Sequence, residues 1–105
     1  VVAFSTVFAT GTTDFRTGYK LITTTRTTGT GGLKLYVNGV LEATANTTAV
    51  TGFPYSLNIF DGAFRNAPAY SSSGGDYGQF TVFNRVLTTV EQTQMEQYLI
   101  AKWGL

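Results

Sequence analysis

The sequence predicts an all-β fold with antiparallel strands and one short C-terminal helix. Segments rich in Val, Ile, Thr, Phe and Tyr recur between short polar turns, a spacing typical of antiparallel sheets. Near the C-terminus, apolar residues recur at three- and four-residue intervals, which is the period of a helix. The expected strands are Val2–Ala9, Tyr19–Thr27, Leu33–Val37, Val40–Ala45, Ser56–Phe60 and Gly78–Asn84.

A tight hairpin is expected in the middle of the chain. Asn38-Gly39 separates the expected strands Leu33–Val37 and Val40–Ala45. This dipeptide favours a type I′ turn, because both central residues of that turn need positive φ. Thr27–Gly32, before the hairpin, has an ordinary length for a connection between two strands. We therefore expect a flexible loop there rather than a linker.

The last expected strand has bulky side chains on both faces. Within Gly78–Asn84, Phe80 and Val82 fall on one face, whereas Thr81 and Phe83 fall on the other. This pattern predicts an interior strand, which Asn84-Arg85 ends.

A capped helix over residues 89–102 is expected to follow. Thr88 and Glu91 have the spacing of a capping box, in which each residue binds the backbone amide of the other. Gly104 supplies the stop.

The apolar residues of this helix are expected to dock it on the sheet. Trp103, one helical step beyond Leu99, is interpreted as a core plug rather than a ligand-binding residue. Glu96 is expected on the helix face toward water. The expected apolar stripe consists of Val90, Met95, Tyr98, Leu99 and Trp103.

Two segments resemble a known family. Asp76–Leu105 is similar to the closing strand, turn and helix of concanavalin A-like lectin/glucanase (laminin-G-like) jelly-roll domains. Leu33–Leu41 is similar to the hairpin that such domains carry near mid-sequence. The resemblance implies an antiparallel β-sandwich with jelly-roll topology.

The resemblance covers roughly Tyr19 to Leu105, which corresponds to the later half of the family's longer domain. We therefore expect residues 1–105 to form a single domain of this kind or its C-terminal half. Three explanations for the missing first half are open: the chain is a fragment or proteolytic product, a neighbouring subunit supplies the other half, or this chain carries a shortened form of the family's domain. The first two together are favoured, and Val1 in place of methionine favours a processed or incompletely recorded N-terminus.

Charged residues are scarce. They make up 12% of the chain, against 43% hydrophobic residues, and that charged share is about half of the usual one. We expect much of the surface to be buried against neighbouring protein. The net charge is +1 and the seven basic residues are scattered, which argues against a nucleic-acid partner.

Two further kinds of feature are excluded by the sequence. The chain has no cysteine, which excludes a disulfide framework or a thiolate metal site. The sequence has no uninterrupted apolar run of the roughly 18 to 20 residues that a membrane span requires. By its resemblance the chain is expected in a virion, outside the cell or on a cell surface.

The long irregular stretch Asp61–Gly75 is the candidate carbohydrate site. An aromatic ring packs against the apolar face of a pyranose while polar side chains bind its hydroxyls. The favoured alternative is that Phe64 and Tyr70 plug the end of the sandwich. The candidate sugar-binding residues are Phe64, Arg65, Asn66, Tyr70 and Tyr77.

Calcium is the only candidate cofactor. Many domains of the family that the chain resembles bind calcium in loops at one rim, and the candidate ligands are Asp61 and Asp76, with Asp14 and Asn66 as further oxygen donors. Calcium prefers several clustered carboxylates, and no such cluster occurs in the sequence. A structural role in turns is therefore favoured for these acids.

The sequence argues against catalysis. Glucanases of the resembled family use a close pair of acidic residues, whereas here Glu91 is assigned to a cap, Glu96 to a helix face and Glu42 stands alone in its strand. The absence of histidine excludes a Ser-His-Asp relay within the chain. We therefore expect that the protein is not an enzyme.

Two functions remain open. The favoured one is a noncatalytic structural or adhesive module, most of all a phage virion component (capsid decoration, tail or fibre) or a similar surface assembly protein. The alternative is a lectin-like carbohydrate-binding module, free or appended to a secreted glycosidase. Expected partners are other protein subunits, the missing half of the domain, or glycans.

Overall fold

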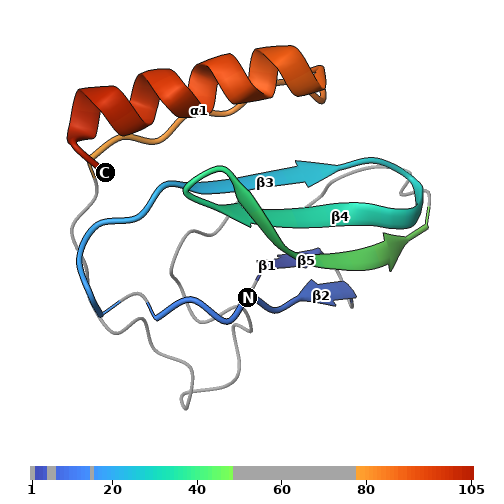
Figure 1. Cartoon of the computed structure of the whole chain (residues 1–105). Helices are drawn as coiled ribbons and strands as arrows, with labels where there is room; N and C mark the ends of the chain where they lie inside the picture. The colour runs from blue at the N-terminus through green and yellow to red at the C-terminus, as the bar shows by residue number, and fades with distance from the viewer. Residues whose placement is uncertain (1, 5–6, 15, 49–77) are drawn as a thin grey trace. The chain divides into compact units, whose positions relative to one another are not determined.

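A computed structural model describes residues 2–4, 7–14, 16–48 and 78–105 (Figure 1). The elements are β1 (Val2–Phe4), β2 (Val7–Ala9), β3 (Ile22–Arg26), β4 (Gly29–Val37), β5 (Val40–Thr47) and α1 (Thr89–Trp103). The main sheet has the order β3-β4-β5 and is antiparallel throughout. The predicted antiparallel sheet and terminal helix are thereby confirmed. The expected strand Ser56–Phe60 lies outside the described residues.

The core lies on one face of the central strand β4. Leu33 and Leu35 are 2% and 3% exposed, and they lie opposite Ala45 and Ala43 of β5, so that these side chains share one face. Ala9 of β2 packs on the same cluster. Ala9 of β2 therefore covers part of the apolar face of the sheet.

The predicted tight turn is confirmed. Asn38 and Gly39 have φ of 48° and 80°, as a type I′ turn requires. The Asn38 backbone N–H donates to the carbonyl of Leu21, and the Asn38 side-chain oxygen accepts from the Leu21 N–H, both at 2.8 Å. Asn38 therefore continues the pairing of β3 with β4 by one residue beyond the pair Ile22–Val37.

The connection Thr27–Gly32 is more ordered than expected. It joins β3 to β4, but its second part belongs to β4 and pairs with β5, with Gly29 opposite Thr47. The Thr27 N–H donates to the Gly32 carbonyl at 2.8 Å. The Thr47 hydroxyl accepts from the Gly29 N–H at 3.1 Å and donates to the Thr27 carbonyl. Because these bonds close the loop, a Cβ on Gly32 would overlap the Thr47 hydroxyl and the Thr27 carbonyl.

Glu42 is the inserted residue of a β-bulge in β5. The register moves from Leu35 opposite Ala43 to Tyr36 opposite Leu41, which leaves Glu42 without an opposed residue. Its carboxylate accepts from the backbone N–H groups of Thr12 and Thr13, at 3.0 and 3.2 Å, and from the Thr13 hydroxyl. The Thr13 hydroxyl is the main reason that the pKa of Glu42 is lowered. Glu42 thus fastens the segment after β2 to the sheet.

Two strand predictions are wrong. Val2–Ala9 is a hairpin of β1 and β2, with Val2 opposite Ala9, rather than one strand, because a short segment that turns back can satisfy its own backbone groups. Gly78–Asn84 forms no strand, and Phe80 and Val82 are exposed. The alternation of side chains between two faces does not by itself produce a strand, because a strand forms only where its backbone N–H and C=O groups bond to a neighbouring strand.

The predicted helix signals are confirmed at both ends. The Glu91 N–H donates to the Thr88 hydroxyl at 3.3 Å, and the Thr88 N–H donates to the Glu91 carboxylate at 2.9 Å. Gly104 adopts the left-handed conformation, with φ 66° and ψ 39°. The helix extends one residue beyond the predicted end at 102.

The predicted orientation of the helix is wrong. Trp103 is 46% exposed rather than a buried plug, whereas Glu96 is buried and accepts a hydrogen bond from the Gln92 amide at 3.0 Å. At about 100° per residue, Trp103 lies about 140° around the helix from Tyr98. The apolar residues therefore do not form the single stripe that the spacing suggested.

We predict that Gly32→Ala lowers the free energy of unfolding by about 2 to 3 kcal/mol, because the new Cβ overlaps atoms of the closed loop. Gly31→Ala is the matched control. Gly31 has φ 62° but open space around it, so its cost is limited to about 1 kcal/mol of backbone strain. Urea unfolding of both variants measures the difference, and equal losses would contradict the packing of this loop.

Candidate functional site

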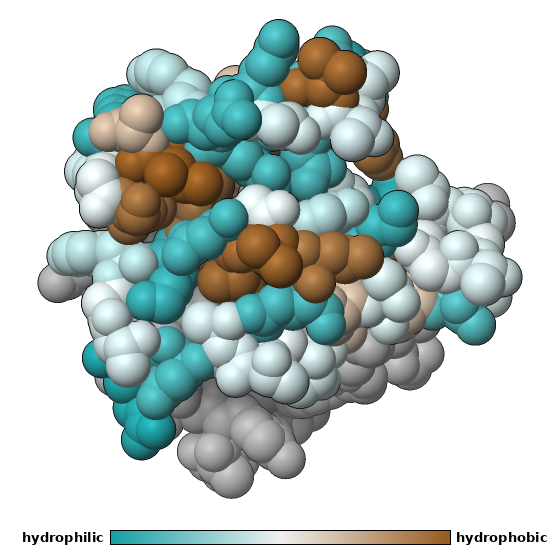
Figure 2. Space-filling view, in the orientation of Figure 1, coloured by the Kyte–Doolittle hydropathy of each residue, from teal (hydrophilic) through white to brown (hydrophobic). Residues whose placement is uncertain are grey.

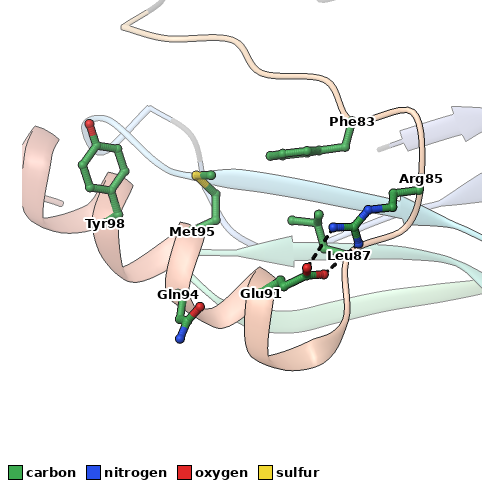
Figure 3. Close-up of a pocket in the computed structure, with 7 residues that line it drawn as sticks. All are labelled: Phe83, Arg85, Leu87, Glu91, Gln94, Met95 and Tyr98. Carbon is green, nitrogen blue, oxygen red and sulfur yellow. Dashed lines mark hydrogen bonds and ion pairs between the residues drawn. The ribbon is translucent and has the colours of Figure 1, made fainter.

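The candidate site is a hollow of about 350 Å³ beside the first half of α1. We call it the helix hollow. Figure 3 shows that Leu87 and Met95 extend toward the side on which the Phe83 ring lies, whereas Gln94 points away from it. The segment before the helix and the helix itself both contribute residues. The lining consists of Phe83, Arg85, Leu87, Glu91, Gln94, Met95 and Tyr98.

An ion pair fixes one end of the helix hollow. The guanidinium of Arg85 donates to both carboxylate oxygens of Glu91, at 2.7 and 2.8 Å (Figure 3). The same carboxylate accepts from the Thr88 N–H. Both side chains are well exposed, so the pair adds little to global stability. Its main effect is to hold the segment before α1 in one geometry.

The electrostatics of the ion pair follow from this geometry. The Arg85 guanidinium, followed by the Thr88 backbone N–H, lowers the pKa of Glu91 from 4.5 to about 2. A carboxyl group whose folded pKa is lowered stabilises the folded state above its unfolded pKa. This contribution is therefore present above pH 4.5 and is lost as the pH falls toward about 2.

The lining suits an apolar or aromatic group. Phe83 and Tyr98 offer rings, and Met95 offers a flexible thioether that packs well against aromatic side chains. The carboxylate of Glu91 is already bound to Arg85 and Thr88. Within the part of the chain that the structure describes, no group of three potential metal ligands occurs.

Large apolar side chains near the helix hollow are exposed. Tyr98 is 56% exposed, and Val90, at the start of the helix, is 66% exposed. Lys102 places its ammonium 5.8 Å from the Tyr98 ring centroid and 5.5 Å from that of Trp103, within reach of a cation–π attraction. On the face in Figure 2, apolar patches interrupt the hydrophilic surface.

The residues predicted for sugar and calcium binding lie outside the described part of the chain. These are Phe64, Arg65, Asn66, Tyr70, Tyr77, Asp61 and Asp76, and both sites stay predictions.

Asp14 confirms the turn role expected for it. Its carboxylate accepts from the Arg16 backbone N–H at 2.9 Å and pairs with the Arg16 guanidinium. The Arg16 side chain, followed by the Arg16 backbone N–H, lowers the pKa of Asp14.

Sequence reasoning missed the helix hollow. Phe83 was assigned to a strand, and Met95 and Tyr98 were assigned to a surface docked on the sheet. One signal was present in the sequence: Arg85 precedes the capping box by a distance that lets it reach Glu91.

Comparisons with known proteins found no matching protein family, no similar curated protein and no similar solved structure. Among the described residues, no helix has the length and apolar character needed to cross a membrane.

We predict that Arg85→Gln returns the pKa of Glu91 from about 2 toward 4.5, because the cation that lowers it is removed. An NMR titration of the glutamate carboxyl carbons measures this change. Arg16→Gln is the matched control, since it removes the same charge from a different ion pair. A Glu91 pKa that stays near 2 in Arg85→Gln would contradict the bidentate pair.

Proposed function

We propose that this chain is a noncatalytic structural or adhesive module that works within an assembly of proteins, such as a phage virion component (capsid decoration, tail or fibre) or a bacterial surface assembly. The observation that carries the proposal is the set of large apolar side chains exposed along α1 and the segment before it. They are Phe80, Val82, Phe83, Val86, Val90, Tyr98 and Trp103, which are 42% to 66% exposed.

Exposed apolar groups of this size favour burial against another protein. Single exposed apolar residues are ordinary, but several together mark interaction surfaces. Here seven of the eleven exposed large apolar side chains among the described residues fall within residues 80–103. Tyr, Trp and Phe are also the residues that protein interfaces prefer. The low charged fraction, 12%, agrees with a chain that buries much of its surface against neighbours.

The sheet offers a second place for completion by a partner. Both backbone groups of Leu21, its N–H and its C=O, bond to Asn38 of the neighbouring segment. Because successive residues of a strand direct these groups to opposite sides, the backbone groups of Ile22 and Thr24 face the outer edge of the sheet. Within the described residues, β3 is an edge strand. Open edges accept further strands, and such strands would extend this sheet toward the jelly-roll sandwich that the family resemblance implies.

The virion or surface setting rests on the resemblance of Asp76–Leu105 to concanavalin A-like domains. The capped helix agrees with that resemblance, whereas the closing strand expected over Gly78–Asn84 does not form. The assembly role itself rests on the exposed side chains and does not depend on the resemblance.

We predict that assembly protects Lys102 from acetylation. The chain has three lysines, Lys20, Lys34 and Lys102, and Lys102 adjoins the exposed aromatic residues of α1. Mass spectrometry compares labelling in the native assembly with labelling of the purified chain. Lys102 should be labelled several-fold less in the assembly, while Lys20, in the segment before β3, serves as the internal control.

Equal labelling of Lys102 in the two samples would overturn the assembly proposal. If the purified monomer instead binds glycans, and loses binding on Tyr70→Ala or Tyr77→Ala, the lectin-like alternative replaces it.

A further inference from the structure

One face of α1 carries an ordered series of side chains. Glu91, Met95, Tyr98 and Lys102 follow one another at steps of four, three and four residues. On a helix these positions fall within about 60° of one another. We call this series the α1 stripe. It has an anion at one end, a cation at the other and two apolar side chains between them.

The α1 stripe is accessible. Tyr98 is 56% exposed, and the Glu91 side chain is 40% exposed despite its pair with Arg85. Three members of the stripe, Glu91, Met95 and Tyr98, also line the helix hollow. A partner that covers the stripe therefore meets a recess beside it rather than a flat helix surface.

The stripe is complementary to itself in one orientation. If a second copy of α1 lies antiparallel, with a two-fold axis between positions 96 and 97, Met95 faces Tyr98 of the second copy and Glu91 faces Lys102 of the second copy. Each contact then occurs twice, as a two-fold interface requires. A parallel arrangement would place Lys102 opposite Lys102 of the second copy, and this repulsion disfavours it.

We propose that the α1 stripe is a homodimer interface, in which two copies of the chain pair their helices antiparallel. This inference rests on the proposed assembly function and names its partner as a second copy. The ring of Tyr98 from each copy enters the helix hollow of the other, against Phe83, Leu87 and Met95. Met–aromatic and aromatic–aromatic contacts then form the apolar centre.

The charges at both ends support the same arrangement. Glu91 keeps its bond to Arg85 and gains Lys102 of the second copy, since a carboxylate has acceptor sites for both. The net charge of +1 per chain creates little repulsion between copies.

The test measures the monomer–dimer equilibrium of the purified full chain by sedimentation equilibrium. Tyr98→Ala removes the apolar centre, and Lys102→Glu places a carboxylate opposite Glu91. Each change should raise the dimer dissociation constant about tenfold or more. Matched controls are Thr93→Ala, at an exposed position on another face of α1, and Lys20→Glu, which makes the same charge change outside the helix. Both controls should leave the dissociation constant unchanged.

Orientation is tested separately with spin labels, because the chain has no cysteine of its own. Single cysteines replace the exposed residues Gln97 and Thr89 in turn. Both positions point away from the interface, so the two arrangements differ in the offset of the labels along the helix axes. In the antiparallel dimer this offset is about 1.5 Å for the two labels at 97 and about 22 Å for the two labels at 89, so the labels at 97 are the closer pair. Equal separations at both positions would overturn the antiparallel arrangement.

The outcomes separate this inference from the assembly function. A dimer that is unaffected by Lys102→Glu and Tyr98→Ala overturns the α1 stripe as its interface. A chain that stays monomeric at all concentrations overturns the homodimer. If Lys102 is nevertheless protected in the native assembly, the assembly function stands and a different protein covers this face of α1. Circular dichroism of each variant at matched concentration shows that lost dimerisation is not lost folding.

Discussion

Burial of Leu33 and Leu35 on one face of β4 is the interaction on which the described fold depends. β4 pairs with β3 on one side and with β5 on the other, and its buried side chains gather Ala9, Ala43 and Ala45 around them. The removal of one such leucine typically costs about 2 to 5 kcal/mol, a large share of the stability of a small domain. The Glu42 bulge fastens the segment after β2 close to this same cluster.

Several large apolar side chains of the described residues lie outside this core. The buried hydrophobic residues among those described are Ala9, Leu33, Leu35 and Val37. Larger apolar side chains, such as those of Tyr98 and Trp103, stay exposed. Burial of apolar surface is the main favourable term in both folding and association. Burial of these side chains against another protein would therefore add stability that the described core does not supply.

Features that depend on a few neighbouring residues could be predicted from the sequence. The positive φ angles of Asn38-Gly39, the Thr88–Glu91 capping box and the Gly104 stop follow from local backbone chemistry. Features that depend on distant partners could not. The role of Glu42 requires Thr12 and Thr13 about thirty residues away. The orientation of α1 and the absence of a strand over Gly78–Asn84 likewise depend on long-range contacts.

The same distinction holds for the candidate site. The Arg85–Glu91 pair is local and had a signal in the sequence, whereas the helix hollow appears only when Phe83 lies beside α1 rather than in a strand.

The central claim is that association completes the burial of apolar surface. The most direct test is the thermal unfolding midpoint of the purified chain over a wide range of protein concentration. Because association stabilises the folded state by mass action, the midpoint should rise with concentration. A midpoint that is independent of concentration would contradict the claim for assembly between copies of this chain.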